Sequence, residues 1–255
     1  MRTLFSLYFF ISFCIAAKSQ SKIDSSDIEI KYKFSYLVDT LDKKSIITEP
    51  MILIANQHKS VYYSEYYKAN IDAVKKQLQG IGNGNVTIDL SEIPRAKVRH
   101  SVYKDGNEIY ISNYLGRNLF TFETNDKINW IIDKNETKTI LNYKCKKAYA
   151  KIGDKNYVAW YTSDIPLNDG PYKFKGLPGL ILMLHDENNY FIFEIIELIR
   201  KKELIKFNQG ILISKEQYLI KRSEYMNDPS QGKINTPEYR KTVEENKKKY
   251  NNSLE

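Results

Sequence analysis

The chain has 255 residues, 42% of them apolar, and its 39 lysines and arginines outnumber its 31 acidic residues to give a formal net charge of +8. This length suits one large domain or two small ones. The basic residues are scattered along the chain, and together with the export signal described next this argues against a nucleic-acid partner.

The first 19 residues show the three parts of a cleavable export signal. Arg2 supplies a positive charge, residues 4–17 form an apolar run, and the small residues Ala17 and Ser19 precede polar sequence. The run is shorter than the roughly 20 residues that span a bilayer. We therefore predict cleavage after Ser19 and export to the periplasm, to the outer membrane or out of the cell. An N-terminal membrane anchor and a lipid on Cys14 are the alternatives, although Phe13 is larger than the residue that lipid attachment favours.

Two regions are expected after the signal peptide (residues 1–19): a β-rich domain over residues 20–213 and a helical segment over residues 214–255. Cys145 would be the one cysteine left in the exported chain, so it has no partner for an intramolecular disulfide. We predict that Cys145 is a small buried residue. A reactive or intermolecular thiol is the alternative.

The β-rich region opens with a strand and soon contains a helix. Apolar and polar residues alternate from Ile28 to Val38, which predicts a strand with one buried face. Further strands are expected over residues 51–56 and 60–63. Tyr67, Ile71, Val74 and Leu78 are then spaced for one face of a helix, with Ser64 as its N-cap.

Residues 97–207 read almost entirely as strands separated by short turns, which predicts hairpins and a meander. Parallel strands would need long crossovers, and there is no room for them, so we expect an antiparallel, β-rich α+β fold. The predicted strands cover residues 97–104, 108–114, 119–123, 129–133, 139–152, 156–163, 179–185, 190–199 and 203–207.

Two helices are expected in the C-terminal segment. Ser214 and Gln217 match a capping box for a helix to about residue 226. Thr236 as N-cap and Pro237 at the first helical position predict a second helix. Because this last helix has little apolar surface, we expect it to be partly loose.

Residues 160–184 form the most unusual segment. Three prolines and three glycines lie between Pro166 and Gly179, and five consecutive apolar residues follow from Leu180. The first part should be a rigid crossing between two strands, and the second a strand buried on both faces. Such crossings commonly build the rim or lid of a cavity. The candidate rim or lid residues are Trp160, Tyr161, Pro166, Pro171, Phe174, Leu177, Pro178 and Leu180.

The six residues from Gly176 to Ile181 match the signature after which the GLPGLI family is named. Residues 136–148, which include Cys145 and Ala148, and the Trp160–Pro171 region also resemble the family, whereas residues 251–255 depart from its usual ending. We interpret Gly176, Gly179, Cys145 and Ala148 as structural motif residues. The resemblance implies an exported protein of Bacteroidetes-type bacteria and no particular activity. More distantly, the chain resembles carriers of the LolA type, which implies a curved, half-barrel-like sheet packed against the predicted helix.

Catalytic residues are scarce. His58, His100 and His185 lie far apart in the sequence and match no metal-ligand spacing, so we expect no metal and no cofactor. Asp164, Asp169 and Asp186 could form a carboxylate pair for hydrolysis. Carboxylates beside prolines and glycines also serve as turn caps.

The sequence therefore predicts an exported cell-envelope protein that is a non-catalytic binding or carrier module for an apolar ligand or a protein partner. An accessory or assembly protein of an outer-membrane or secretion complex is one alternative, and a hydrolase using the paired carboxylates is another. The lysines at 241 and 247–249 suit a solvated helix face, or peripheral contact with an anionic membrane. The oligomeric state is left open.

Overall fold

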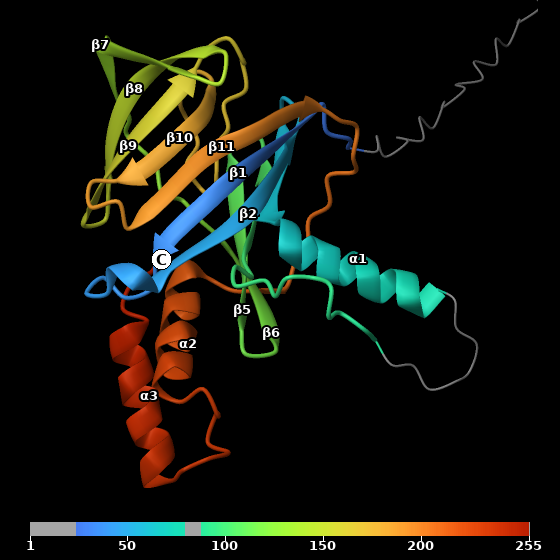
Figure 1. The fold of residues 1–255 in the computed structure, drawn as a ribbon, viewed down its shortest axis with the longest axis vertical. Coiled ribbons are helices and arrows are strands. Elements are labelled where there is room, and N and C mark those ends of the chain that lie inside the picture. The colour runs from blue at the N-terminus through green and yellow to red at the C-terminus, as the bar shows by residue number, and fades with distance from the viewer. Residues whose placement is uncertain (1–23, 80–87, 255) are drawn as a thin grey trace, which may run out of the picture.

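The computed structural model describes residues 24–79 and 88–254, so the predicted signal peptide lies outside the described residues. These residues form a twelve-stranded open sheet with one helix from the N-terminal half of the chain and two C-terminal helices (Figure 1). Every pair of neighbouring strands is antiparallel except β12 and β6. The β-rich α+β prediction is confirmed.

The strand order is β12-β6-β5-β4-β3-β2-β1-β11-β10-β9-β8-β7. Two meanders, β1 to β6 and β7 to β11, are therefore joined side by side where β1 pairs with β11. The strands are β1 (Ile28–Leu37), β2 (Ile46–Ala55), β3 (Lys59–Ser64), β4 (Ser101–Asp105), β5 (Glu108–Leu115), β6 (Asn118–Glu123), β7 (Ile131–Ile140), β8 (Tyr143–Ile152), β9 (Lys155–Thr162), β10 (Leu180–Asp186), β11 (Phe191–Arg200) and β12 (Ile211–Leu212).

The connection between β6 and β7 shows how strongly this sheet must curl. The two strands are ten inter-strand steps apart in the strand order, which is about 48 Å in a flat sheet. The chain from Glu123 to Ile131 has eight Cα–Cα steps and can span at most about 29 Å. The sheet must therefore bend until these strands approach each other, as the half-barrel prediction implies.

The inner face of the curl holds the main hydrophobic core. The alternation predicted for β1 places Ile30, Tyr32 and Phe34 there, each at most 2% exposed. Residues 163–179, which connect β9 to β10, contribute Tyr172, Phe174 and other side chains to the same core. The inner face is thus filled by a segment of the chain itself.

The opposite face of β2, β3 and β4 is covered by residues 201–210. Ile205 packs with Ile52, Ile54 and Val61, and the Phe207 ring stacks on Tyr103 with 4.4 Å between centroids. The prediction of a strand over residues 203–207 was wrong. This segment crosses the face of the sheet and makes only one isolated bridge, between Leu204 and Ser25.

Several other strand predictions had wrong boundaries, and two of them have a clear structural reason. Residues 139–152 are not one strand, because the chain turns at Leu141, whose φ is +50°, and separates β7 from β8. The strand expected from Lys97 begins only at Ser101. The buried carboxylate of Glu49 accepts hydrogen bonds from the backbone N–H groups of Lys97 (2.7 Å) and Val98 (3.0 Å), and this replaces strand pairing there.

The three helices lie at the margins of the sheet. Helix α1 (Glu65–Gln79) begins after the predicted N-cap Ser64 and extends away from the sheet (Figure 1). Helices α2 (Lys215–Asn227) and α3 (Pro237–Lys249) have the predicted capping box and proline start. Among the described residues, no helix is both long enough and apolar enough to cross a membrane.

Candidate functional site

The segment of residues 163–179 crosses the inner face of the sheet with most of its side chains buried. Of the eight predicted rim residues, Pro166 and Pro178 are exposed and the other six are buried. Leu177 and Phe174 are at most 1% exposed and belong to the main core. Four open grooves of about 400 to 770 Å³ lie elsewhere, and none is lined by these eight residues. A rim or lid role for them stays a prediction.

The residues of the predicted structural motif are placed as follows. Cys145 and Ala148 are fully buried, and burial raises the pKa of the Cys145 thiol. Gly176 is exposed and Gly179 is buried. Gly179 has a φ of +144°, and a Cβ added to it would lie 2.0 Å from the Thr162 carbonyl oxygen. The backbone of the signature therefore passes very close to the end of β9.

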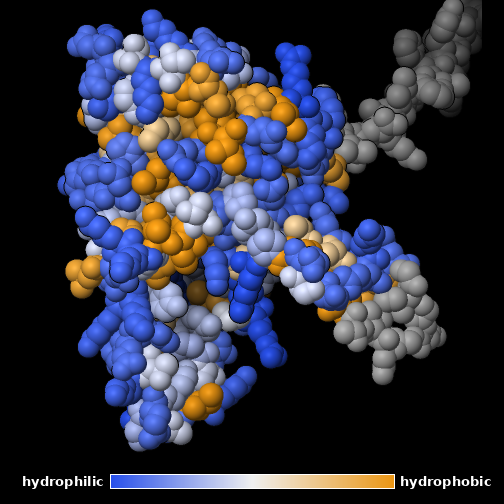
Figure 2. Space-filling model, in the orientation of Figure 1, coloured by the Kyte–Doolittle hydropathy of each residue, from blue (hydrophilic) through white to orange (hydrophobic). Residues whose placement is uncertain are grey.

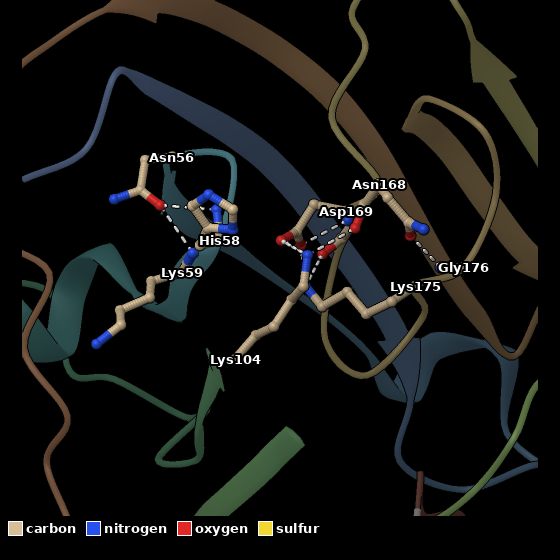
Figure 3. Close-up of polar contacts among 9 residues, drawn as sticks. Asn56, His58, Lys59, Lys104, Asn168, Asp169, Lys175 and Gly176 are labelled. Carbon is tan, nitrogen blue, oxygen red and sulfur yellow. Dashed lines mark hydrogen bonds and ion pairs between the residues drawn. The ribbon is translucent and has the colours of Figure 1, made fainter. Parts of the chain in front are cut away.

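A buried ion triad holds this segment to the far side of the curl. The Asp169 carboxylate is fully buried and contacts the ammonium groups of Lys175, from the same segment, and Lys104, from β4 (Figure 3). The Lys104 Nζ atom lies 3.3 Å from the carboxylate and donates to the Asn168 carbonyl oxygen at 2.8 Å. The Lys175 Nζ atom also donates to the Gly170 carbonyl oxygen at 2.6 Å.

The triad keeps its carboxylate ionised. Burial alone would raise the pKa of Asp169, but the charges of Lys175 and Lys104 outweigh it and hold the pKa below its usual value. Burial, opposed by the Asp169 charge, lowers the pKa of Lys175. An ionised carboxylate lacks the proton that a general acid donates, and its burial between two lysines denies it the access to substrate that a general base needs.

The other two candidate carboxylates lie apart from the triad. Asp164 is exposed in the turn after β9. Asp186 is buried at the opposite end of β10, where its carboxylate accepts hydrogen bonds from the backbone N–H groups of Phe191 (2.7 Å) and Asn188 (3.3 Å). The length of β10, about 20 Å, separates these two positions. The structure therefore does not bring the candidate carboxylates together, and Asp186 has the alternative role of a turn cap.

Two inner-face polar atoms have no hydrogen-bond partner within the described chain: the Tyr62 hydroxyl oxygen and His100 Nε2. The His100 ring lies between aromatic side chains, with its centroid 4.8 Å from that of Tyr172 and 6.4 Å from that of Tyr62. These polar side chains in the core were not predicted from the sequence. One signal was available, since Val98, His100, Val102 and Lys104 alternate, which places Lys104 on the buried face of β4.

We expect His100 to make stability depend on pH. Burial lowers the pKa of His100 to about 4, whereas an unfolded histidine titrates near 6.5. Between these values the unfolded state binds a proton that the folded state does not, so stability should fall as the pH decreases. From pH 7 to pH 4 we expect a loss of about 2–3 kcal/mol in the free energy of unfolding, measured by urea denaturation.

His100→Phe keeps the aromatic packing and should remove most of this pH dependence. His58→Gln is the matched control, because His58 is exposed in the β2–β3 turn and its replacement should leave the profile unchanged. The same slope in wild type and His100→Phe would show that another group titrates.

No group of three or more His, Cys, Asp or Glu side chains in the described residues is arranged to hold a metal ion. His185, the remaining histidine, places its Nδ1 atom 2.9 Å from the Asp186 carbonyl oxygen.

The outer face of β7 to β11 carries a row of partly exposed side chains. Directly opposed residues on successive strands give the order Ile131, Tyr149, Val158, His185 and Ile192, which we call the outer row. None of the five belongs to a core cluster, and Ile131 is 71% exposed. In the same orientation as Figure 1, Figure 2 shows apolar surface gathered over the upper part of the molecule, where these strands lie.

Trp160 lies on β9 two residues after Val158, so its side chain is on the same face of the sheet as the outer row. It is 8% exposed and belongs to the main hydrophobic core cluster, and the Nζ atoms of Lys138 and Lys147 lie 5.0 and 5.6 Å from its ring centroid. A rim role for Trp160 stays a prediction.

Comparison with known proteins supports the fold and gives no activity. The family described as "Protein of unknown function (Porph_ging)" matches residues 151–183, which include the Gly176–Ile181 signature. Two structures of PNGF-II, in space groups P21 and C2, are similar with TM-scores of 0.54 and 0.52 at 20% identity. The matches cover 77% and 78% of this chain but only 33% and 32% of PNGF-II, so the chain spans about a third of that protein. No curated protein matches the chain in sequence.

Proposed function

We propose that the chain is an exported, non-catalytic binding module of the cell envelope, and that its ligand is a protein partner. The observation that carries this proposal is the outer row, where apolar and aromatic side chains face solvent on a sheet whose inner face is already filled. Exposed apolar patches of this kind mark protein-binding surfaces in soluble proteins. Aromatic side chains such as Tyr149 are enriched at such surfaces.

An apolar small molecule fits the structure less well than a protein does. A carrier that encloses such a ligand needs an apolar cavity, and pockets of this kind bury most of the ligand. Here Tyr172, Phe174 and Leu177 occupy the inner face of the curl. The similarity to about a third of PNGF-II supports the same choice, since this fold can occur as one part of a larger protein.

An accessory role in an outer-membrane or secretion complex is a second form of the same proposal, because it uses the same exposed surface. A hydrolase is the least supported alternative, since Asp164, Asp169 and Asp186 lie in three separate environments. We also propose that the chain is a GLPGLI family member. The letter-for-letter signature at Gly176–Ile181, and the match of residues 151–183 to a family of unknown function, support this membership.

The outer row is tested with the double variant Ile131→Lys/Val158→Lys, which places two charges in this row, one on β7 and one on β9. The tagged protein is expressed in its own host, crosslinked in the envelope and purified for native mass spectrometry. We expect the wild type to hold a protein in fixed stoichiometry, and the double variant to retain at least tenfold less of it. A tenfold loss corresponds to about 1.4 kcal/mol, which is modest for two charges buried at an interface.

The matched control is Leu41→Lys, because Leu41 is 90% exposed and lies outside the outer row. It should retain the partner, and all variants should melt cooperatively. Equal capture by the double variant and the wild type would refute the proposed surface. A lipid-sized ligand in place of a protein would refute the proposed partner class in favour of a carrier.

A further inference from the structure

Strand β7 forms an edge of the sheet. It ends the strand order, and among the described strands it pairs only with β8 (Figure 1). At the other end of the order lies β12, which is two residues long and leaves little edge to pair with. β7 has ten residues, and every residue from Lys134 to Thr139 is exposed. Of the two described edges, β7 therefore offers the longer one to another chain.

The free hydrogen-bonding groups of this edge follow from the pairing of β7 with β8. Beyond a bulge at residues 134–136, the two strands pair without interruption up to the turn. A two-residue turn joins Ile140 to Tyr143, which makes these two residues a hydrogen-bonded pair. Hydrogen-bonded and non-hydrogen-bonded pairs alternate in an antiparallel ladder, so the N–H and C=O groups of Thr137 and Thr139 point away from β8. An extended backbone matches the spacing of these groups.

The hairpin of β7 and β8 is strongly basic. From Ile131 to Ile152 it contains two carboxylates, Asp133 and Glu136, and Glu136 pairs with Lys147 at 2.9 Å. Its formal charge is +4, the six lysines less the two carboxylates. This charge favours an acidic partner, and it disfavours a second copy of the chain, because two such hairpins would repel each other. The six lysines are Lys134, Lys138, Lys144, Lys146, Lys147 and Lys151.

We propose that β7 binds an acidic, extended segment of a partner protein, which pairs with Thr137 and Thr139 as an added strand. Main-chain hydrogen bonds supply the affinity of such a contact, and the surrounding lysines select acidic side chains. Ile131, the end of the outer row, lies on the same strand, so one partner can contact both surfaces. This inference rests on the proposed function, since it takes the ligand to be a protein.

The test uses the full exported chain and two synthetic peptides of about ten residues, the upper length of ordinary strands. One alternates glutamate with valine, and the other alternates lysine with valine. Fluorescence anisotropy should show that the acidic peptide binds at least tenfold more tightly than the basic one, and less tightly as salt is added. Hydrogen exchange should show that the acidic peptide protects the Thr137 and Thr139 amides, because their N–H groups gain acceptors.

Thr139→Pro removes one outward N–H group, and an edge strand tolerates proline at such a position. It should weaken binding of the acidic peptide about tenfold or more. Thr139→Val is the matched control, because it keeps the N–H group and nearly the same side-chain shape, and it should change binding less than twofold. If Thr139→Pro fails to fold, the double variant Lys144→Glu/Lys146→Glu leaves the backbone intact and should weaken binding by a similar factor.

The inference is overturned if the acidic peptide does not bind, or if it binds without protecting the Thr137 and Thr139 amides. A wild-type dimer that Thr139→Pro dissociates would assign the edge to a second copy and would also overturn it. Failure here is distinguishable from failure of the proposed function. If Thr139→Pro retains the envelope partner and the outer-row double variant loses it, the proposed function stands and the added strand is refuted.

Discussion

Replacing Asp169 by asparagine is expected to destabilise the protein by about 3–5 kcal/mol, because two buried ammonium groups would lose their counter-charge. Lys104 and Lys175 have side chains that are 10% and 7% exposed, so water cannot readily solvate them in place of the carboxylate. The lost interaction also ties residues 163–179 to β4. The free energy of unfolding is obtained from urea denaturation at pH 7.

The matched control is Asp164→Asn in the same segment. Asp164 is exposed, so this change should stay within about 0.5 kcal/mol of the wild type. Lys175→Met should compensate in part for Asp169→Asn, since the double variant leaves one buried charge in place of two that repel each other. Strictly additive effects would show that the Asp169 and Lys175 side chains do not interact in the folded protein.

The pH dependence of Asp169 has the same sign as that of His100 but falls in a lower pH range. The pKa of Asp169 is lower in the folded state than in the unfolded state, so its contribution is present above the unfolded value of about 3.9 and is lost as the pH falls below it. The difference between wild type and Asp169→Asn should therefore shrink only below about pH 4. The His100 effect falls instead between about pH 6.5 and pH 4.

Gly179→Ala is the second substitution with a large expected effect, about 3 kcal/mol or more. The added Cβ would lie 2.0 Å from the Thr162 carbonyl oxygen and 2.7 Å from its carbonyl carbon, and both are backbone atoms that cannot rotate away. The φ of +144° adds conformational strain for any residue with a Cβ. Thermal denaturation should show a lower Tm.

Gly106→Ala separates strain from steric overlap. Gly106 also has a positive φ, +59°, but nothing lies within 4 Å of an added Cβ, so about 1 kcal/mol is expected from strain alone. Equal destabilisation by the two substitutions would mean that the contact between Gly179 and β9 is not tight. A much larger effect at Gly179 would explain in physical terms why a glycine stands at this position of the signature.

The sequence predicted the elements better than it predicted the site. Strict alternation in β1, the capping box at Ser214 and the N-cap at Thr236 are local signals, and each was confirmed. The run from Leu180 was correctly expected to be a buried strand, with Leu180, Ile181, Leu182 and Leu184 fully buried. These predictions succeeded because the alternation of apolar residues and the identity of capping residues depend only on residues close together in the sequence.

The triad could not be predicted, because it depends on long-range placement. Lys104 and Asp169 are 65 residues apart, and only the curl of the sheet brings them into contact. The Pro/Gly segment was correctly expected to be constrained, but composition does not indicate whether such a segment encloses a space or fills it.

The pairing of β1 with β11 has a consequence for how the chain reaches its folded state. Ile28 lies opposite Arg200, so the central strand of the finished sheet has a free edge until nearly 200 residues have been made. During that time β1 presents unpaired N–H and C=O groups beside apolar side chains, which is a template for mispairing with other chains. Such a non-local contact is also slow to form. A chain with this topology is therefore exposed to mispairing until β11 has been made.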